Sequence, residues 1–234
     1  MVVKSALPDS SDKRGFVRDM FDRIAPRYDL VNRLMTFGLD QVWRRQALAV
    51  AGVGPSDRVL DLACGTGDLT ELCAERGARV IGADFSNQML RTARARNEAI
   101  PLCQGDALRL PFRSGSLQAV TCGFAMRNFT DLDAMLVDAA RVLEPKGRLI
   151  LLEVDEPDSR LLRWGHRIHM NQIVPRLGSW LSDSDAYRYL PASFAYLPGA
   201  GELRAQLEKA GFERIEKKSH AFGAVQRLIA RRSS

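Results

Sequence analysis

The stretch from Arg58 to Asp84 reads RVLDLACGTGDLTELCAERGARVIGAD and decides the fold. It begins with a short apolar run, Arg58–Ala63, which is typical of a buried strand. The glycine turn Gly65–Gly67 follows and leads into a helix-like segment at Asp68–Arg76. A second apolar run at Arg79–Ala83 repeats the strand pattern. This order predicts two neighbouring parallel strands joined by a crossover helix.

The same alternation continues beyond this stretch. Further strands are expected at Leu102–Gly105, Leu117–Gly123 and Arg148–Val154, with a final pair at Arg214–Lys218 and Ala224–Ala230. Helices are expected at Asn87–Arg96, with Ser86 as its N-cap, at Leu132–Leu143 and at Gly201–Ala210. The sequence therefore predicts an α/β, Rossmann-like fold with a mostly parallel seven-stranded sheet and helices on both faces.

Two segments fall outside the alternation. From Phe16 to Met35 the apolar residues recur at the helix period, and Pro26 is expected to break this stretch into two short helices before a third at Asp40–Val50. Residues 1–52 are therefore expected to form a helical lid, and residues 155–198, rich in aromatic residues, an insertion over the acceptor site or a set of packing helices. We expect one domain over residues 1–234.

Composition narrows the class of protein. The chain has 234 residues, 46% of them hydrophobic and 26% charged, which is ordinary for a globular domain. Its apolar runs are far shorter than a membrane span, and its first fifteen residues lack a secretion-signal core, so a cytoplasmic protein is expected. The net charge of +6 forms no continuous basic face, which argues against nucleic acid but leaves open a peripheral contact with the inner membrane face.

The cysteines give no sign of a disulfide framework or a metal site. Cys64, Cys73, Cys103 and Cys122 lie far apart and form no C-x-x-C pair. We expect reduced, mostly buried thiols and no metal.

Acidic residues gather where the predicted strands end. Asp61, Asp68, Asp84 and Asp106 all lie at or after carboxyl ends of strands, the edge at which open α/β sheets bind ligands. Thr70 occupies the place of the third glycine in the dinucleotide fingerprint G-x-G-x-x-G, which argues against a nicotinamide cofactor. Four carboxylates without a lysine would repel a pyrophosphate and favour a cationic ligand.

The spacing of these groups suggests one ligand. Asp84 can accept both hydroxyl protons of a ribose, and Asp106 can accept the amine of an adenine while the Ala107 amide donates to the ring. Asp61 and the Gly65–Gly67 backbone are then left for an amino-acid end with an ammonium group. S-adenosylmethionine satisfies all of these positions. The alternative is that the aspartates only cap turns and helices.

Several motifs resemble known families. The segments DLACGTGD (61–68), GADFSNQML (82–90) and GDALRLPF (105–112) are similar to the cofactor motifs of class I methyltransferases. The segments FDRIAPRYDLVNRLMTFGLDQVWRR (21–45), GFAMRNFTDLDAML (123–136) and AYRYLPAS (186–193) resemble the ubiquinone and menaquinone biosynthesis C-methyltransferase family. The resemblance runs from about Phe21 to Phe212.

This resemblance implies transfer of a methyl group from S-adenosylmethionine to a ring carbon of a reduced polyprenyl quinone such as demethylmenaquinol, with S-adenosylhomocysteine as the other product. The expected cofactor-binding residues are Asp61, Gly65, Thr66, Gly67, Asp84, Phe85, Asp106, Ala107 and Gly123. The family usually has a serine where this chain has Gly123, and a glycine where it has Ala125, so the resemblance leaves one hydrogen bond to cofactor or substrate open.

On the acceptor side, Arg127 and Asn128 are expected to position and stabilise the phenolate of the acceptor. His166 and His169 replace a tyrosine pair of the family and are candidate catalytic bases; without a third ligand they do not predict a metal site. The expected acceptor pocket is lined by Phe124, Met126, Tyr187 and Tyr189.

Other functions are weighed beside this one. A methyltransferase for the carbon, oxygen or nitrogen of a small aromatic or polyketide-like metabolite fits the same cofactor motifs, as does a non-catalytic protein that binds S-adenosylmethionine. An RNA methyltransferase fits the basic composition but lacks the expected motif and basic surface. The partner expected is a small-molecule aromatic or quinol acceptor, and a homodimer is left open.

Overall fold

The computed structural model describes residues 7, 8, 12–157, 159–168, 170, 172 and 183–234. Its strands are β1 (Arg58–Leu62), β2 (Arg79–Asp84), β3 (Leu102–Gln104), β4 (Leu117–Gly123), β5 (Leu143–Val154), β6 (Phe212–His220) and β7 (Val225–Arg232). They form one seven-stranded sheet in the order β3-β2-β1-β4-β5-β7-β6, in which β7 runs antiparallel to both neighbours. The predicted fold class is confirmed.

Helices surround this sheet. The long ones are α1 (Lys13–Ile24), α2 (Tyr28–Thr36), α3 (Leu39–Ala51), α4 (Asp68–Glu75), α5 (Asn87–Arg96), α6 (Leu132–Val142), α7 (Arg160–Ile168), α9 (Ser184–Ala192) and α10 (Ala200–Lys209). The 3-10 turns are η2 (Ala25–Arg27), η3 (Met126–Asn128), η5 (Ser193–Tyr196) and η6 (Ala221–Gly223). Pro26 breaks the N-terminal helix at η2, and the Ser86 hydroxyl caps α5 by accepting from the Met89 amide. Both agree with the sequence-based expectation.

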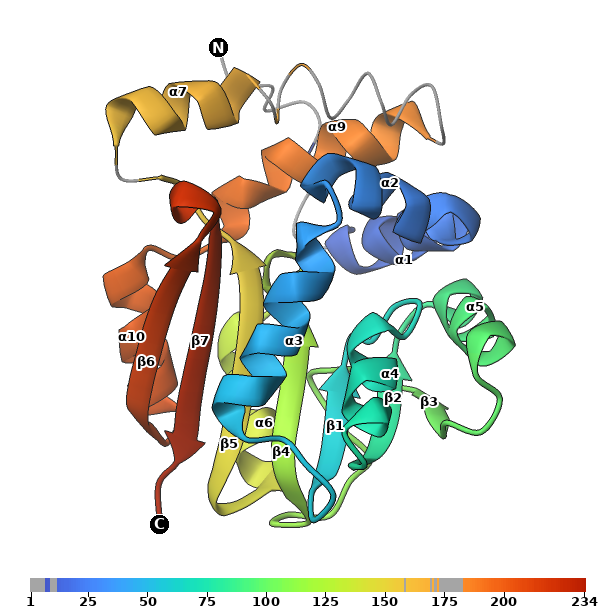
Figure 1. Ribbon diagram of the computed structural model, residues 1–234, viewed down its shortest axis with the longest axis vertical. Helices are drawn as coiled ribbons and strands as arrows, with labels where there is room; N and C mark the ends of the chain where they lie inside the picture. The colour runs from blue at the N-terminus through green and yellow to red at the C-terminus, as the bar shows by residue number, and fades with distance from the viewer. Residues whose placement is uncertain (1–6, 9–11, 158, 169, 171, 173–182) are drawn as a thin grey trace.

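The two faces of the sheet carry separate cores because side chains alternate along a strand. Val59 packs with the buried faces of α3 and α4, whereas its neighbour Leu60 packs with α6 and α10. Figure 1 shows α3 in front of the sheet and α6 and α10 behind it. Burial on both faces explains why β1 reads as a continuous apolar run.

A third cluster lies above the carboxyl ends of the parallel strands. Met20 and Val31 from the N-terminal helices are buried together with Met89 of α5 and Tyr189 of α9. Figure 1 shows α1, α2, α7 and α9 stacked at that end of the sheet. α1 and α2 therefore share one layer with α7 and α9, which are far away in sequence, whereas α3, expected as part of the lid, packs against a face of the sheet.

One strand begins earlier than expected. The sequence pattern starts a strand at Arg148, but β5 begins at Leu143, which pairs with Leu117 before the register shifts. Helix α6 ends at Val142, and Pro145 and Gly147 follow within β5. They do not prevent the pairing with β4, because the register shifts between Leu117 and Ala119, opposite the segment that contains them. Within the described part of the chain, none of the helices is both long enough and apolar enough to cross a membrane.

Candidate active site

A pocket lies at the carboxyl ends of the first strands, beside the point where the strand order reverses between β1 and β4. It encloses about 900 Å³, its open mouth included. From the sheet side it is lined by Leu62, Ala63, Gly65, Ala83, Asp84, Phe85, Ser86, Met89, Gly105, Asp106, Ala107, Leu108, Gly123, Phe124, Ala125, Asn128, Phe129 and Thr130. From the helical layer it is lined by Arg14, Val17, Arg18, Phe21 and Tyr28. The predicted convergence of strand ends is confirmed.

The glycine turn after β1 depends on backbone conformations that favour glycine. Gly65 and Gly67 have φ values of +57° and +92°. A β-carbon on Gly67 would also lie 3.3 Å from the β-carbon of Ala93 in α5. Gly67 thus lets α4 start close to α5, but it is not among the residues lining the pocket. Its expected role in cofactor binding stays a prediction.

Asp84 is held in place by the backbone. Its carboxylate accepts from the amides of Gly65 and Ser86, each at 2.8 Å. Burial raises the pKa of Asp84, and the hydrogen bonds from the Ser86, Gly65 and Phe85 amides oppose that effect. Each carboxylate oxygen keeps a second acceptor position. Asp84 can therefore accept ligand hydroxyl groups in the pocket without losing its own contacts.

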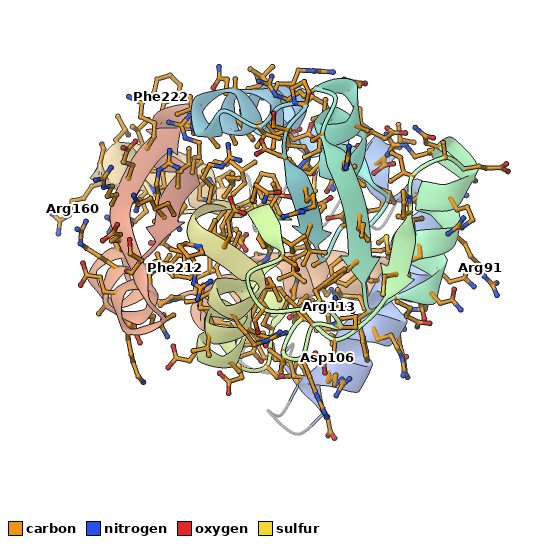
Figure 2. The ribbon with its side chains drawn as sticks, turned by 90° about the horizontal axis from the view of Figure 1, so that it is seen from below. Arg91, Asp106, Arg113, Arg160, Phe212 and Phe222 are labelled. Atoms are coloured by element: carbon orange, nitrogen blue, oxygen red, sulfur yellow. The ribbon has the colours of Figure 1, made fainter. Side chains whose placement is uncertain are left out.

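Asp106 joins the sheet to the helical layer. Its carboxylate accepts from the Leu108 amide at 3.0 Å and pairs with the Arg14 guanidinium at 2.9 Å. The Arg14 guanidinium also lies 4.6 Å from the centre of the Phe85 ring. Figure 2 shows Asp106 beside the N-terminal helix α1. Asp106, Phe85 and Ala107 all line the pocket, as expected of cofactor-binding residues.

Asp61 does not line the pocket. It is buried, and it accepts from the hydroxyls of Thr70 at 2.6 Å and Thr121 at 2.8 Å. Burial raises its pKa to about 6. Asp61 thus lies buried behind the glycine turn, with one hydroxyl donor on each carboxylate oxygen, and its contact with the ammonium group of a ligand stays a prediction.

The expected ring of open carboxylates is corrected. Asp68 is buried and accepts from Arg33 at 2.8 Å and Arg96 at 3.1 Å. Burial alone would raise its pKa, but the Arg33 hydrogen bond and the nearby positive charges of Arg44, Arg33 and Arg96 lower it. With Asp106 paired to Arg14, only Asp84 faces the pocket without a cationic partner among the described ion pairs.

Thr66 fastens the glycine turn to the helical layer. Its buried hydroxyl donates to Asp29 of α2 at 2.6 Å, and its carbonyl accepts from Arg96 at 3.1 Å. Its side chain holds the turn and it is not among the residues that line the pocket, so its contact with the cofactor stays a prediction.

Arg127 is not placed as predicted. Its guanidinium pairs with Glu153 and donates to the Phe124 carbonyl at 2.8 Å and to the Ser193 hydroxyl at 3.2 Å. It is buried and is not among the residues that line the pocket, and its Nε and Nη1 donate to Ser193, Phe124 and Glu153. Asn128 does line the pocket, and its Oδ1 accepts from the Tyr189 hydroxyl at 3.3 Å.

The predicted acceptor residues are divided by the fold. Phe124 lines the pocket, whereas Met126 is buried in the core between the sheet and α6. Tyr189 is buried too, with its ring centre 5.4 Å from that of Phe16. These two residues are therefore corrected from pocket lining to support behind it. The backbone of Tyr187 belongs to α9, but its side chain lies outside the described residues.

Of the two candidate bases, His166 and His169, the structure describes only His166. His166 lies in α7 with its ring stacked on Phe194 at 6.1 Å, and it is absent from the pocket lining. His169 lies outside the described residues. In the described ranges, no group of three or more histidine, cysteine or acidic side chains is arranged to hold a metal ion.

Sequence reasoning missed the cationic and aromatic residues that the N-terminal helices bring to the pocket. Arg14 and Arg18 line it beside Phe21 and Tyr28. The helical period places Phe21 and Tyr28 on the inward face, so their burial was detectable. The arginines gave no such signal, since charged residues at a helix start are usually exposed.

Comparisons with known proteins agree with this geometry. The model of the ubiE/COQ5 methyltransferase family matches residues 8–231. A demethylmenaquinone methyltransferase from Thermus thermophilus is 44% identical over 200 residues, covering 82% of this chain and 91% of the relative. The ubiquinone/menaquinone biosynthesis C-methyltransferase UbiE of Methylococcus capsulatus is 41% identical over 229 residues, 94% of this chain and 91% of the relative. A SAM-dependent methyltransferase from Thermotoga maritima has the same fold, with a TM-score of 0.66 at 19% identity over 93% of this chain and 100% of the other.

Proposed function

The chain belongs to the ubiE/COQ5 methyltransferase family, and from that premise we propose that it methylates a ring carbon of a reduced polyprenyl quinone of the demethylmenaquinol type. It is a methyltransferase that uses S-adenosylmethionine. The observation that carries the choice of acceptor is the 44% identity, over most of both chains, to a protein named for demethylmenaquinone.

The pocket fits the methyl donor. Asp84 presents acceptor positions at the end of β2, where a ribose would sit, and Asp106 and Ala107 stand after β3, where an adenine would sit. Phe85 between them supplies an apolar ring. When bound, S-adenosylmethionine supplies an electrophilic methyl group on a sulfonium.

In the reaction, the acceptor ring carbon forms a bond to the methyl carbon while the bond from that carbon to sulfur breaks and sulfur keeps the electron pair. The ring carbon then gives up its proton to water, which restores the aromatic ring as the phenolate. This attack requires an ionised hydroxyl on the acceptor, and a hydrogen-bond donor placed at that oxygen stabilises the charge.

Asn128 is the residue we assign to that donation. The Tyr189 hydroxyl donates to its Oδ1, which orients the amide, and Nδ2 has no acceptor among the described residues. Arg127, next in the chain, anchors this segment by pairing with Glu153 beneath it. Arg127 is thus a positioning residue, and Asn128 is the residue that touches the acceptor.

The helical layer serves as the lid. Val17, Phe21 and Tyr28 line the pocket from above, and the Asp22 carboxylate accepts from the Ser86 hydroxyl at 2.5 Å. When both reactants are bound, this cover would hold them together and keep water from them, which contributes a large part of the rate enhancement in two-substrate reactions.

We further propose that the enzyme meets its acceptor at a membrane surface. Large apolar side chains are exposed on α7 and η6, where Leu161, Trp164 and Phe222 are 74%, 65% and 84% exposed. Figure 2 shows Phe222 at the periphery of the molecule. The protein should co-sediment with anionic liposomes at low salt, and Trp164→Ser with Phe222→Ser should weaken this severalfold. Absence of binding at low salt would remove the membrane contact but not the enzymatic proposal.

The transfer assay tests the function itself. The purified chain is incubated with methyl-labelled S-adenosylmethionine and reduced demethylmenaquinone, in parallel with small phenols and naphthols. Label should enter the quinol ring carbon and little should enter the small aromatic compounds. Preferential labelling of the small compounds would indicate a metabolite methyltransferase, and binding without any transfer would indicate a non-catalytic protein.

A substitution at Asn128 tests the assigned donor. Asn128→Asp places a negative charge where the acceptor oxygen becomes negative, so kcat should fall about 100-fold or more while donor binding changes little. Asn87→Asp makes the same chemical change on the exposed start of α5 and should leave kcat unchanged. Equal rates for the Asn128→Asp variant and the unaltered enzyme would exclude Asn128 from the reaction.

A further inference from the structure

Arg44 in α3 is a buried cation without a hydrogen bond. The residue is 5% exposed, and its Nε has no partner. The nearest carboxylate oxygens, on Asp68 and Asp40, lie 3.4 Å from Nη2 and 3.8 Å from Nε. No hydrogen bond from this guanidinium is found in the described part of the chain.

The two aspartates near Arg44 are already satisfied by another arginine. Arg33 donates to Asp40 at 2.5 Å and to Asp68 at 2.8 and 3.1 Å. Asp68 also accepts from Arg96 at 3.1 Å. Arg44 therefore lies at ion-pair distance from both carboxylates but donates a hydrogen bond to neither, and a buried cation with unsatisfied donors is costly.

The guanidinium of Arg44 instead adjoins the pocket wall. It lies 5.0 Å from the centre of the Phe124 ring, and Phe124 lines the pocket. Its Nη1 is 3.4 Å from the position that a β-carbon on Gly123 would take. Gly123 therefore places no side chain against this cation, which lies directly behind the pocket lining, between Leu69 and the Phe124 ring.

An anionic group in this part of the pocket would complete the hydrogen bonding of Arg44. With the nucleoside near Asp84 and Asp106 at the ends of β2 and β3, the amino-acid end of the methyl donor falls on the side of β1 and β4, next to Gly123. That end carries one anion, a carboxylate, which is the preferred partner of a guanidinium. We propose that Arg44 binds the carboxylate of the methyl donor through its unpaired donors; this rests on the proposed use of S-adenosylmethionine.

The proposal is tested by removing the carboxylate from the ligand and the guanidinium from the protein. S-adenosylhomocysteine and its decarboxylated analogue, which keeps the nucleoside, sulfur and amine, are titrated by calorimetry. The unaltered protein should bind the carboxylate-bearing ligand about 10- to 100-fold more tightly. Arg44→Gln should bind both with about equal affinity, because only the affinity for the carboxylate-bearing ligand falls.

Two further variants make the result specific. Arg45→Gln removes the adjacent, exposed charge of the same helix and should keep the preference. Arg44→Lys keeps a cation and should retain part of the preference for the carboxylate-bearing ligand. This variant can be measured even if Arg44→Gln fails to fold.

The outcomes separate this assignment from the function on which it rests. An unaltered protein with equal affinity for the two ligands, or an Arg44→Gln variant that weakens both equally, would overturn the role of Arg44 while leaving cofactor binding intact. Binding of neither nucleoside by the unaltered protein would overturn the proposed function as well.

Discussion

The pocket has two walls built in different ways. On the sheet side, backbone groups hold the functional atoms: the amides of Gly65 and Ser86 fix Asp84, and the chain path of the glycine turn leaves room for a ligand. On the helical side, long side chains make the contacts, as in the pair of Arg14 with Asp106. The positions of groups held by backbone hydrogen bonds are fixed once the sheet has formed. Helices held by exposed side-chain contacts can move away from the sheet and open the pocket. We therefore expect the sheet wall to determine the affinity for the methyl donor, and the helical wall to determine how ligands enter the pocket.

The largest effect is expected at the sheet wall. Asp84→Asn removes the charge and one acceptor from a site that must bind hydroxyl groups and two backbone amides. Charged hydrogen bonds are about twice as strong as neutral ones, so affinity for S-adenosylhomocysteine should fall about 100-fold. Calorimetry measures this, with Glu98→Gln on the exposed surface as the control. An affinity within about threefold of normal would show that the sheet wall does not dominate binding.

A pH effect on stability should come from beneath the same wall. Burial raises the pKa of Asp61 to about 6, above its ordinary value of 3.8. The folded state therefore holds this proton through a pH range in which the unfolded chain has released it. The Asp61 contribution is fully present below about pH 4 and is lost as the pH rises through about 6. In the unaltered protein, this loss should lower the free energy of unfolding by roughly 1 to 3 kcal/mol over that pH range. Asp61→Asn should abolish this decrease.

Urea unfolding at several pH values tests this, with Asp138 as a comparison of opposite sign. Burial would raise the pKa of Asp138, but hydrogen bonds from Arg141 and the Leu110 amide lower it. Its contribution is present above its unfolded pKa and is lost as the pH falls. Asp61→Asn and Asp138→Asn should therefore change the pH slope in opposite directions. The same slope for the unaltered protein and Asp61→Asn would contradict a raised pKa.

The smallest effect is expected at the helical wall. Arg14→Ala removes an exposed ion pair and a cation–π contact, each worth about 1 kcal/mol or less, so the KM for the methyl donor should rise about 3- to 10-fold with little change in melting temperature. Arg18 lies farther from the Phe85 ring, at 6.0 Å, and pairs with its neighbour Asp19, so Arg18→Ala should change KM less. If Arg14→Ala lowered affinity as much as Asp84→Asn, the two walls would not differ in the way described.

The sequence predicted the parts of the site that local pattern controls. The alternation of strands and helices, the break at Pro26 and the Ser86 cap all follow from spacing and backbone preference over a few residues. Asp84, Asp106 and Ala107 reach the pocket because the ends of parallel strands meet at one edge. These positions need no knowledge of distant contacts.

The sequence did not show which groups pair with the charged residues of the site. Asp61 pairs with Thr121, sixty residues away in sequence, and Arg127 pairs with Glu153, twenty-six residues away. Both residues were expected at the ligand and both are engaged inside the protein. Arg44 shows the converse: Asp40, Trp43, Arg44 and Ala47 share one face of α3, and a charge on such a face indicates an internal ion pair or a contact with a ligand.

The sequence by itself determined that this chain forms a parallel sheet, that its strand ends meet and that its motifs resemble those of quinone C-methyltransferases. Only the tertiary structure decided which of the charged residues face the pocket and which neutralise one another behind it. The reason is physical: backbone conformation responds to near neighbours, whereas the availability of a charged group depends on which groups from distant parts of the chain reach it first.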